Sequence, residues 1–221
     1  MRKIITTTFV TLDGVLQAPG GPEEDPTKGF NWGGWSFNYW DEIMNSTMND
    51  FMSRKFDLLL GRYTYEIFAA HWPYISGDPV SEKFNKANKY VVSHMKIKLD
   101  WQNSILITGN VVSELKKLKE KDGNELWVHG SGNLIQTLLA NDLVDTFYIW
   151  TFPVIIGKGK RLFADGSRPQ GLKLIDSKTS STGVIITSYE PAGDLKTGSF
   201  ALDKPTETEL ERRKKLAKEM N

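Results

Sequence analysis

The residues best suited to binding an anion follow an apolar run in the second half of the chain, at Gly130-Ser131-Gly132-Asn133. Closely spaced glycines after a strand let several backbone N–H groups converge, and the N-terminus of a following helix adds positive potential. Such a turn suits a phosphate group. The match to the dinucleotide fingerprint is partial, because Ile135 stands where the third glycine belongs. A tight strand-to-helix turn without a ligand explains this segment equally well.

A second turn of this kind follows the apolar run 57–60. Gly61 ends that run, Arg62 can pair bidentately with a phosphate, and Thr64 can cap a helix or donate to the same anion. A capped helix with a solvated arginine is the alternative interpretation. Two phosphate-suited turns at strand ends make a dinucleotide more plausible than either turn does alone.

A third candidate is Ser93, at the end of another apolar run. Its hydroxyl could bond a ribose or its 2′-phosphate, with His94 or Lys96 supplying positive charge. An ordinary strand end is the competing explanation.

Three carboxylates are candidate catalytic groups. Asp13 and Gly14 form a turn dipeptide, but an aspartate at the end of a central strand could also bind a donor on a substrate. Asp41 and Glu42 open a predicted helix, where acidic residues interact favourably with the helix dipole. The functional hypothesis is that one of them meets a heterocycle N–H or supplies a proton.

Aromatic side chains near these carboxylates could stack on a flat ring, and Trp35 and Trp40 are the candidates for substrate binding. Residues 17–35 contain five glycines, three prolines and an acidic cluster, so they predict a long loop. Loops of that length are usually lids, binding loops or disordered segments. The glycine-rich segment 153–163 lacks the spacing of a phosphate loop and is interpreted as a structural turn.

The elements that must position these residues alternate between short apolar runs and amphipathic segments. We expect strands at 4–10, 57–60, 89–93, 104–107, 125–129, 144–152, 172–179 and 184–189, and helices at 38–53, 63–72, 79–87, 111–121 and 134–141. This order predicts an α/β fold: a mixed, mostly parallel sheet with helices on both faces, ending in an antiparallel hairpin. Parallel sheets of this kind bind ligands at the carboxyl ends of their strands.

Composition excludes several classes of protein. The 28 basic and 27 acidic residues nearly cancel, which argues against nucleic acid or an anionic membrane as the main partner. There is no cysteine, and the three histidines are far apart in sequence, so we expect no metal site. No stretch approaches the roughly 18 apolar residues of a membrane span. The expectation is a cytoplasmic protein.

The last part of the chain differs in composition from the rest. Residues 192–221 comprise a polar connector and a segment, 205–220, of mostly charged residues and leucine. We expect residues 1–191 to form one domain, and 205–220 a solvated helix that is peripheral, lies between subunits or is partly disordered.

Taken in order, these segments resemble a known family. Thr11-Leu12-Asp13-Gly14-Val15, Leu59-Leu60-Gly61-Arg62-x-Thr64-Tyr65-Glu66, Val128-His129-Gly130-Ser131-Gly132 and Pro153-Val154-Ile155-Ile156-Gly157-x-Gly159-Lys160-Arg161-Leu162-Phe163 are similar to the dihydrofolate-reductase-like family. Within it, the chain resembles the reductase domain of the bifunctional riboflavin-biosynthesis deaminase–reductase, over roughly residues 2–190.

The resemblance implies NADPH as cofactor, a small heterocyclic substrate and, commonly, a homodimer. It places Gly61, Arg62 and Thr64 at the cofactor pyrophosphate and Ser93 at the adenosine ribose phosphate. The turn Gly130, Ser131, Gly132 and Asn133 would hold phosphate as well. Residues 14–35, with Gly14 as a cofactor contact, would close over the nicotinamide.

The expected function is therefore NADPH-dependent reduction of a pterin- or pyrimidine-like ring. One alternative is the riboflavin-pathway reduction of a ribosylaminopyrimidine phosphate, which needs a basic pocket, with Lys158, Lys160 and Arg161 as candidates. Another is a catalytically silent nucleotide-binding or assembly module. Two features depart from the family: the deaminase half is absent, and Asp41 or Glu42 only approximately fills the place of the carboxylate on the first helix of a dihydrofolate reductase.

Overall fold

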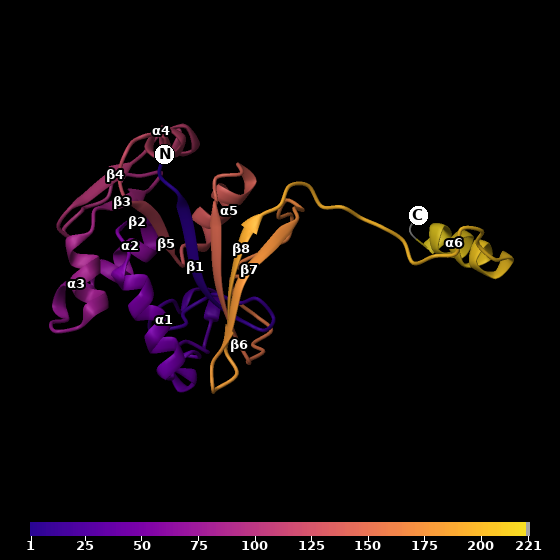
Figure 1. Cartoon of the computed structure of the whole chain (residues 1–221), viewed down its shortest axis with the longest axis horizontal. Coiled ribbons are helices and arrows are strands. Elements are labelled where there is room, and N and C mark those ends of the chain that lie inside the picture. The colour runs from indigo at the N-terminus through magenta and orange to yellow at the C-terminus, as the bar shows by residue number, and fades with distance from the viewer. Residues whose placement is uncertain (220–221) are drawn as a thin grey trace.

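The computed structural model describes residues 1–219, within which eight strands form one mixed sheet (Figure 1). The strands are β1 Ile4–Thr11, β2 Phe56–Gly61, β3 Lys89–Val92, β4 Ser104–Ile107, β5 Glu125–His129, β6 Thr146–Phe152, β7 Leu172–Thr179 and β8 Ile185–Pro191. Their order is β4-β3-β2-β5-β1-β6-β8-β7. Strands β1 to β6 are parallel, whereas β8 is antiparallel to both β6 and β7. The predicted mostly parallel sheet with a C-terminal antiparallel hairpin is confirmed.

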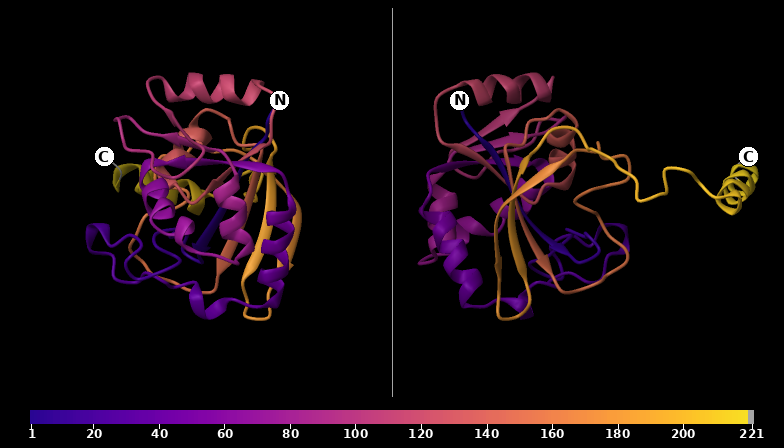
Figure 2. Two further views of the ribbon diagram at one scale, coloured as in Figure 1. Left: turned by 90° about the vertical axis from the view of Figure 1, so that its left-hand side faces the viewer. Right: turned by 45° about the vertical axis from the view of Figure 1, so that its right-hand side comes forward.

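Helices cover both faces of this sheet (Figure 2). They are α1 Glu42–Ser53, α2 Arg62–Ala69, α3 Pro79–Lys86, α4 Val111–Glu120, α5 Gly132–Ala140 and α6 Glu207–Glu219, with short 3-10 turns at Thr27–Gly29, Phe37–Tyr39 and Trp72–Tyr74. Apolar residues of α1, α2 and α3 pack with Trp127 and Trp150 on one face. Those of α4 and α5 pack with Leu126 and Val128 on the other. Alternation along β5 produces this division, because successive side chains of a strand point to opposite faces.

Two predicted helices are shorter than expected. The helix expected at 38–53 begins only at Glu42, because Trp40 is extended and Asp41 is the N-cap. The helix expected at 63–72 ends at Ala69, and a 3-10 turn containing Pro73 follows. Proline cannot continue an α-helix, since it lacks the N–H donor and clashes with the preceding turn.

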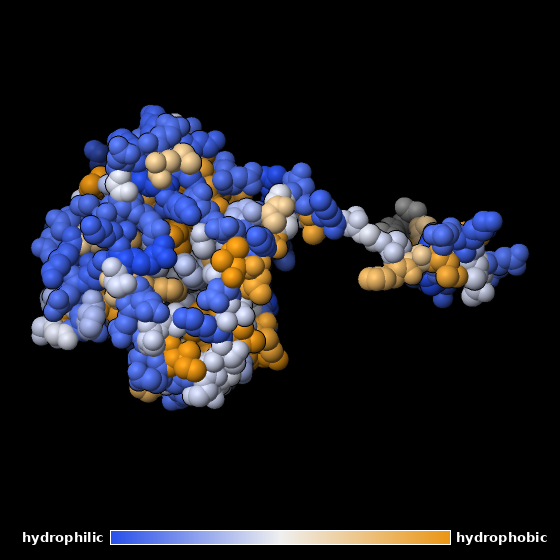
Figure 3. All heavy atoms as spheres, viewed as in Figure 1, coloured by the Kyte–Doolittle hydropathy of each residue, from blue (hydrophilic) through white to orange (hydrophobic). Residues whose placement is uncertain are grey.

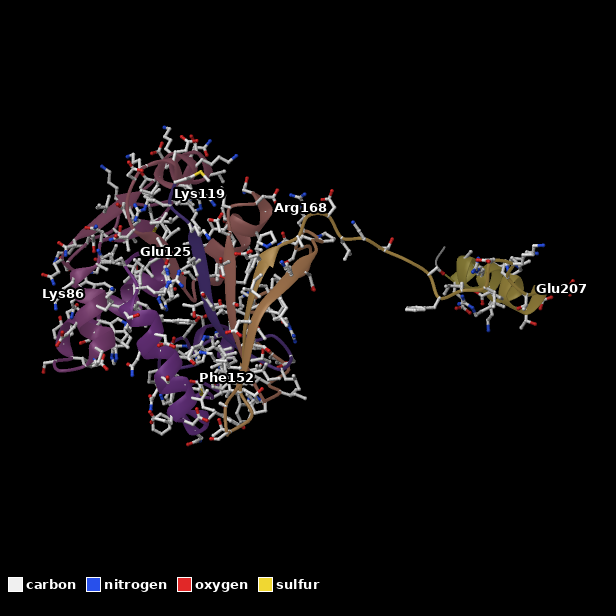
Figure 4. The ribbon with its side chains drawn as sticks, in the orientation of Figure 1. Lys86, Lys119, Glu125, Phe152, Arg168 and Glu207 are labelled. Carbon is white, nitrogen blue, oxygen red and sulfur yellow. The ribbon has the colours of Figure 1, made fainter. Side chains whose placement is uncertain are left out.

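The two edges of the parallel strands differ in how their charged residues are used. In Figure 4, Lys119 and Glu125 mark the amino-terminal edge, and Phe152 marks the carboxyl edge at the end of β6. At the amino-terminal edge, Lys119 pairs with Asp145, Glu125 pairs with Arg54, and Arg2 pairs with Asp57. Charged side chains at this edge thus form structural ion pairs with one another.

The C-terminal segment stands apart from the sheet. Strand β8 ends at Pro191, and an extended connector leads to α6, which Figures 1 and 2 show away from the body. Helix α6 ends at Glu219, and Met220, the last residue of the helix predicted from sequence, lies outside the described residues. In the described chain, no helix is both long and apolar enough to cross a membrane.

Strand β7 forms an exposed edge of the sheet, and all eight of its residues are exposed. Leu172, Leu174 and Ile175 on β7 and Ile185 on β8 have exposed fractions between 37% and 51%. Figure 3 shows apolar side chains gathered over the region of β7 and β8. An edge strand of this kind is available for pairing with another chain.

Candidate active-site cleft

A cleft of about 1600 Å³ opens at the carboxyl edge of the parallel strands. Its walls come from the ends of β1, β2, β3 and β5, from the starts of α2 and α5, and from the loop that follows β1. Ligand pockets are usually about 300–1,000 Å³. This cleft is therefore large enough to accept two ligands side by side.

The two turns that the sequence suggested for phosphate meet in this cleft. Strands β2 and β5 are neighbours, and the Gly61 N–H donates to Ser131 Oγ at 3.0 Å. Ser131 has left-handed backbone angles, φ 57° and ψ 52°, which a residue other than glycine rarely adopts. Strain of this kind, about 1–3 kcal/mol, concentrates at binding sites.

The helices that open on the cleft differ from the others in their N-terminal capping. Asp41, Asp78 and Asn110 cap α1, α3 and α4 by accepting a backbone N–H with their side chains, and Thr206 does so for α6. In residues 1–219, only α2 and α5 begin without a side-chain cap. The N–H groups of an uncapped first turn, together with the positive end of the helix dipole, favour an anion.

Polar side chains surround these two helix N-termini. Arg62 is the first residue of α2; its guanidinium pairs with Glu66 at 3.1 Å and lies 4.0 Å from the centroid of the Tyr63 ring. Thr64 lines the cleft but does not cap α2. Ser93, beyond β3, lines the cleft too, and its hydroxyl donates to the Met95 carbonyl at 2.7 Å.

The glycine-rich segment 153–163 holds the loop after β1 against the cleft. The Lys160 N–H donates to Gln17 Oε1 at 3.0 Å, and Lys160 Nζ pairs with Asp25 at 2.5 Å. Gly159 has φ 142°, and a Cβ there would lie only 2.6 Å from Val15 Cγ1. This position therefore requires glycine. The segment interpreted as a structural turn anchors the base of the loop.

Asp13 is part of the same anchor. Its carboxylate accepts the N–H groups of Ile156 at 3.2 Å and Gly157 at 2.8 Å, and the Thr11 hydroxyl. Burial acts to raise the pKa of Asp13, but these hydrogen bonds outweigh it and hold the pKa below the ordinary value. The carboxylate does not line the cleft.

Asp41 and Glu42 also lie outside the cleft. Asp41 accepts from Met44 N at 2.9 Å and from the N–H and hydroxyl of Ser181, in the turn between β7 and β8. The bond from Met44, with those from Ser181, lowers the pKa of Asp41. This carboxylate joins α1 to the β7–β8 hairpin, so it holds these two elements together and does not face a ligand in the cleft.

Of the two candidate tryptophans, one lines the cleft. Trp40 does, whereas Trp35 packs edge-on against Phe152 and donates its indole N–H to the Gln17 carbonyl at 2.8 Å. Eight of the nine predicted cofactor-binding residues line the cleft: Gly61, Arg62, Thr64, Ser93, Gly130, Ser131, Gly132 and Asn133. The ninth, Gly14, does not, and its carbonyl accepts the N–H of Leu162.

Apart from Trp40, the sequence did not indicate the residues of one part of the site. Side chains from β1, β5, α1, α2 and α3, together with Trp40 ahead of α1 and Trp72 in the 3-10 turn Trp72–Tyr74, form an aromatic chamber in the cleft: Phe9, Trp40, Met48, Phe68, Trp72, Phe84 and His129. His129 lies 4.9 Å from Phe84 between ring centroids. Burial among these rings lowers its pKa to about 3, so the imidazole is neutral at physiological pH. Alternation along residues 125–129 could have placed His129 on one face of the sheet, but not against these particular rings.

The cleft also has acidic side chains. Among the described residues, its carboxylates are Glu24, Asp25 and Asp165, and none belongs to the aromatic chamber. Glu24 accepts the N–H groups of Gly20 and Gly21, and burial raises its pKa. In residues 1–219, no group of three His, Cys, Asp or Glu side chains is arranged to hold a metal ion.

This sheet and cleft define an α/β protein with the dihydrofolate-reductase-like fold. Dihydrofolate reductase from Enterococcus faecalis, solved with NADP(H), aligns with a TM-score of 0.55 over 86% of this chain and 96% of that chain, at 12% identity. A putative riboflavin biosynthesis protein from Shewanella aligns with a TM-score of 0.60 over 86% of this chain and 98% of that one, at 22% identity.

The chain belongs to the RibD C-terminal domain family, whose model matches residues 2–186. It is 31% identical over 197 residues to the uncharacterized protein YyaP of Bacillus subtilis, covering 85% of this chain and 94% of that protein. In fold it is also similar to a deaminase/reductase from Thermotoga maritima, with a TM-score of 0.58 and 16% identity over 86% of this chain and 57% of that one. The resemblance inferred from the sequence is thereby confirmed.

Proposed function

We propose that this protein is an NADPH-dependent reductase that transfers a hydride to a small flat heterocycle, pterin- or pyrimidine-like, held in the aromatic chamber. The observation that supports this most directly is the pairing of Gly61 with Ser131 between two uncapped helix N-termini. Two adjoining anion-suited turns match the two phosphates of a dinucleotide. The aromatic chamber in the same cleft matches a flat second ligand.

The residues that line the cleft fit this cofactor. Arg62, Thr64 and the turn 130–133 would bind the pyrophosphate, and Ser93 would lie by the adenosine ribose phosphate. NADPH supplies the hydride. The protein contributes orientation and the exclusion of water, for which the loop after β1 and its anchor to Lys160 are suited.

A second candidate is the riboflavin-pathway reduction, whose substrate carries its own phosphate. Lys160 and Arg161 line the cleft, whereas Lys158 does not. Lys160 is already paired with Asp25, and Arg161 donates to the backbone carbonyls of Asp13 and Gly157. A substrate phosphate would have to compete with these bonds, which favours the first candidate. A catalytically silent nucleotide-binding module remains the alternative of another class.

We further propose that the protein works in the cytoplasm as a homodimer, with β7 as the contact between copies. The unpaired edge of β7 and its exposed Leu172, Leu174 and Ile175 offer both backbone hydrogen bonds and apolar surface to a second copy. Neither nucleic acid nor a membrane is expected as a partner.

The experiment that tests the proposed function is a titration of the purified protein with NADPH and NADH, followed by tryptophan fluorescence. Trp40 and Trp72 line the cleft, so binding there should change the emission. Tight and selective binding of NADPH is the expected result, followed by NADPH oxidation with a pteridine or pyrimidine. No binding of either nucleotide at millimolar concentration would remove the cofactor from the proposal.

A further inference from the structure

Three cleft residues carry buried polar atoms that have no hydrogen-bond partner. In the described chain, four buried side-chain nitrogen or oxygen atoms are unpaired, and those of Thr8, Trp72 and His129 belong to residues that line the cleft. Folded proteins satisfy nearly all buried polar groups, so each exception requires an explanation. Unpaired atoms that cluster around one cleft point to a ligand as their missing partner.

Two of these atoms belong to the aromatic chamber. His129 Nε2 and Trp72 Nε1 are both shielded from water, and the Phe84 ring packs against both side chains, at centroid distances of 4.9 and 5.2 Å. Thr8 is different: His129 pairs in register with Thr7, so alternation places Thr8 on the opposite side of β1. Thr8 therefore belongs to another part of the cleft.

The chamber lacks the group expected from a dihydrofolate reductase, namely a carboxylate on the first helix. Helix α1 contributes Met48 to the cleft, while Asp41 is bonded to Ser181 outside it. A carboxylate would pair with a protonated amino-substituted ring through two charge-assisted hydrogen bonds. Methionine can only pack against such a ring.

We propose that His129, assisted by the Trp72 N–H, is the group that hydrogen-bonds and orients the substrate ring in the aromatic chamber, in the role a carboxylate would otherwise fill. This inference rests on the proposed function, because it concerns the substrate part of the same cleft. His129 lies at the end of β5, one residue before the turn 130–133. His129 therefore lies between the aromatic chamber and the phosphate-suited turn 130–133, at the end of a sheet strand.

The chemistry of these groups defines which rings fit. An indole N–H can only donate, so Trp72 requires an acceptor such as a ring carbonyl. A neutral imidazole offers one donor and one acceptor. The same apolar surroundings that depress the pKa of His129 also penalise a cationic ring. The site should therefore select uncharged rings with carbonyl groups over protonated amino-substituted rings.

A matched pair of probes tests this selection: 2,4-dioxopteridine and 2,4-diaminopteridine, titrated into the full-length protein with and without NADPH. We expect the dioxo compound to bind at least about tenfold more tightly, since an unpaired polar group strongly penalises the wrong ligand. H129F should abolish this preference while leaving the NADPH dissociation constant unchanged. W72F, which keeps an aromatic ring and loses the indole N–H, should weaken binding of the dioxo compound alone.

A gain-of-function pair provides the control. M48E adds the missing carboxylate and should shift the preference toward the diamino compound, by at least about tenfold, the scale of a charge-assisted hydrogen bond. M48Q has a similar size and no charge, so it should leave the preference with the dioxo compound.

Three results would overturn the inference. The first is tighter binding of the diamino compound by the wild-type protein, and the second is an equal loss of affinity for both compounds in H129F. The third is a protein that binds NADPH but neither pteridine. Failure of NADPH to bind would instead count against the proposed function. In that case the ratio of the dissociation constants of the dioxo and diamino compounds, measured without cofactor, still decides the role of His129.

Discussion

The backbone N–H of Gly61 donates to Ser131 Oγ at 3.0 Å, joining two turns that are 70 residues apart in sequence. Ser131 makes this bond from a left-handed backbone conformation, and its hydroxyl does not cap its own helix. Because Gly61 ends β2 and Ser131 follows β5, this hydrogen bond joins the two helix N-termini that open on the cleft, beyond the point where the two strands pair.

Removing the Ser131 hydroxyl should lower both the stability of the protein and its affinity for the nucleotide. Ser131→Ala leaves the Gly61 N–H without its partner, which should lower the free energy of unfolding by about 1 kcal/mol. NADPH affinity should fall as well, because the two turns lose the bond that joins them. Chemical denaturation and fluorescence titration measure the two effects. The control is Ser199→Ala in the connector, expected to change stability by less than about 0.5 kcal/mol.

Arg62 offers the most direct test of the phosphate site. Arg62→Ala should weaken NADPH binding by about 1.5–3 kcal/mol, the range for a hydrogen bond to a charged group. Isothermal titration gives the dissociation constant, with Arg212→Ala on α6 as the control for loss of an arginine. An unchanged constant for Arg62→Ala would place this residue outside the site.

The low pKa of His129 makes stability depend on pH. The folded imidazole stays neutral down to about pH 3, whereas an unfolded histidine takes up a proton below about pH 6.5. Since the unfolded state binds more protons in this window, its free energy falls relative to the folded state as the pH drops from 6.5 to 3. The contribution of His129 is constant above that window.

His129→Phe isolates this effect from the titration of the carboxylates. Below pH 6.5, the free energy of unfolding of the variant should rise relative to that of the wild type, by up to about 1.4 kcal/mol for each pH unit. Urea denaturation at a series of pH values measures it, with His94→Phe, at an exposed histidine, as the control. A difference that stays constant across the window would contradict the burial of a neutral His129.

The proposed dimer contact can be tested at a single edge residue. Leu174→Asp places a charge on the exposed edge strand β7 and should convert a dimer to a monomer of half the mass in sedimentation equilibrium. Ile105→Asp is the matched control, since Ile105 is 46% exposed on β4, the opposite edge of the same sheet. If the wild-type protein sediments as a monomer, or if only Ile105→Asp dissociates it, β7 is not the contact.

Deletion of residues 195–221 tests the C-terminal boundary that we expect for the folded domain. Gly193 is bonded to Gly171 and Asp194 pairs with Arg168, but the connector beyond them runs away from the body. The truncated protein should keep its NADPH affinity and its stability to within about 0.5 kcal/mol. Thermal denaturation and fluorescence titration check both, and a large loss of stability would show that α6 belongs to the fold.

The sequence alone determined the order of strands and helices and the turns that end the strands. These features are local, because alternating apolar residues and closely spaced glycines act over a few neighbouring positions. The same local signals identified eight residues that line the cleft, and Gly61 and Ser131 were recognised separately as phosphate-suited positions. That they bond one another followed only from the pairing of β2 with β5.

Only the tertiary structure decided the tasks of the acidic and aromatic residues. Asp13 bonds to Gly157, and Asp41 bonds to Ser181, 144 and 140 residues away in sequence. A carboxylate beside a turn or at a helix start looks the same in sequence whether its partner is a ligand or a distant backbone N–H. His129 is the converse case: its role depends on aromatic rings that α2, α3 and the 3-10 turn Trp72–Tyr74 bring against its strand, because burial is a property of the packed molecule.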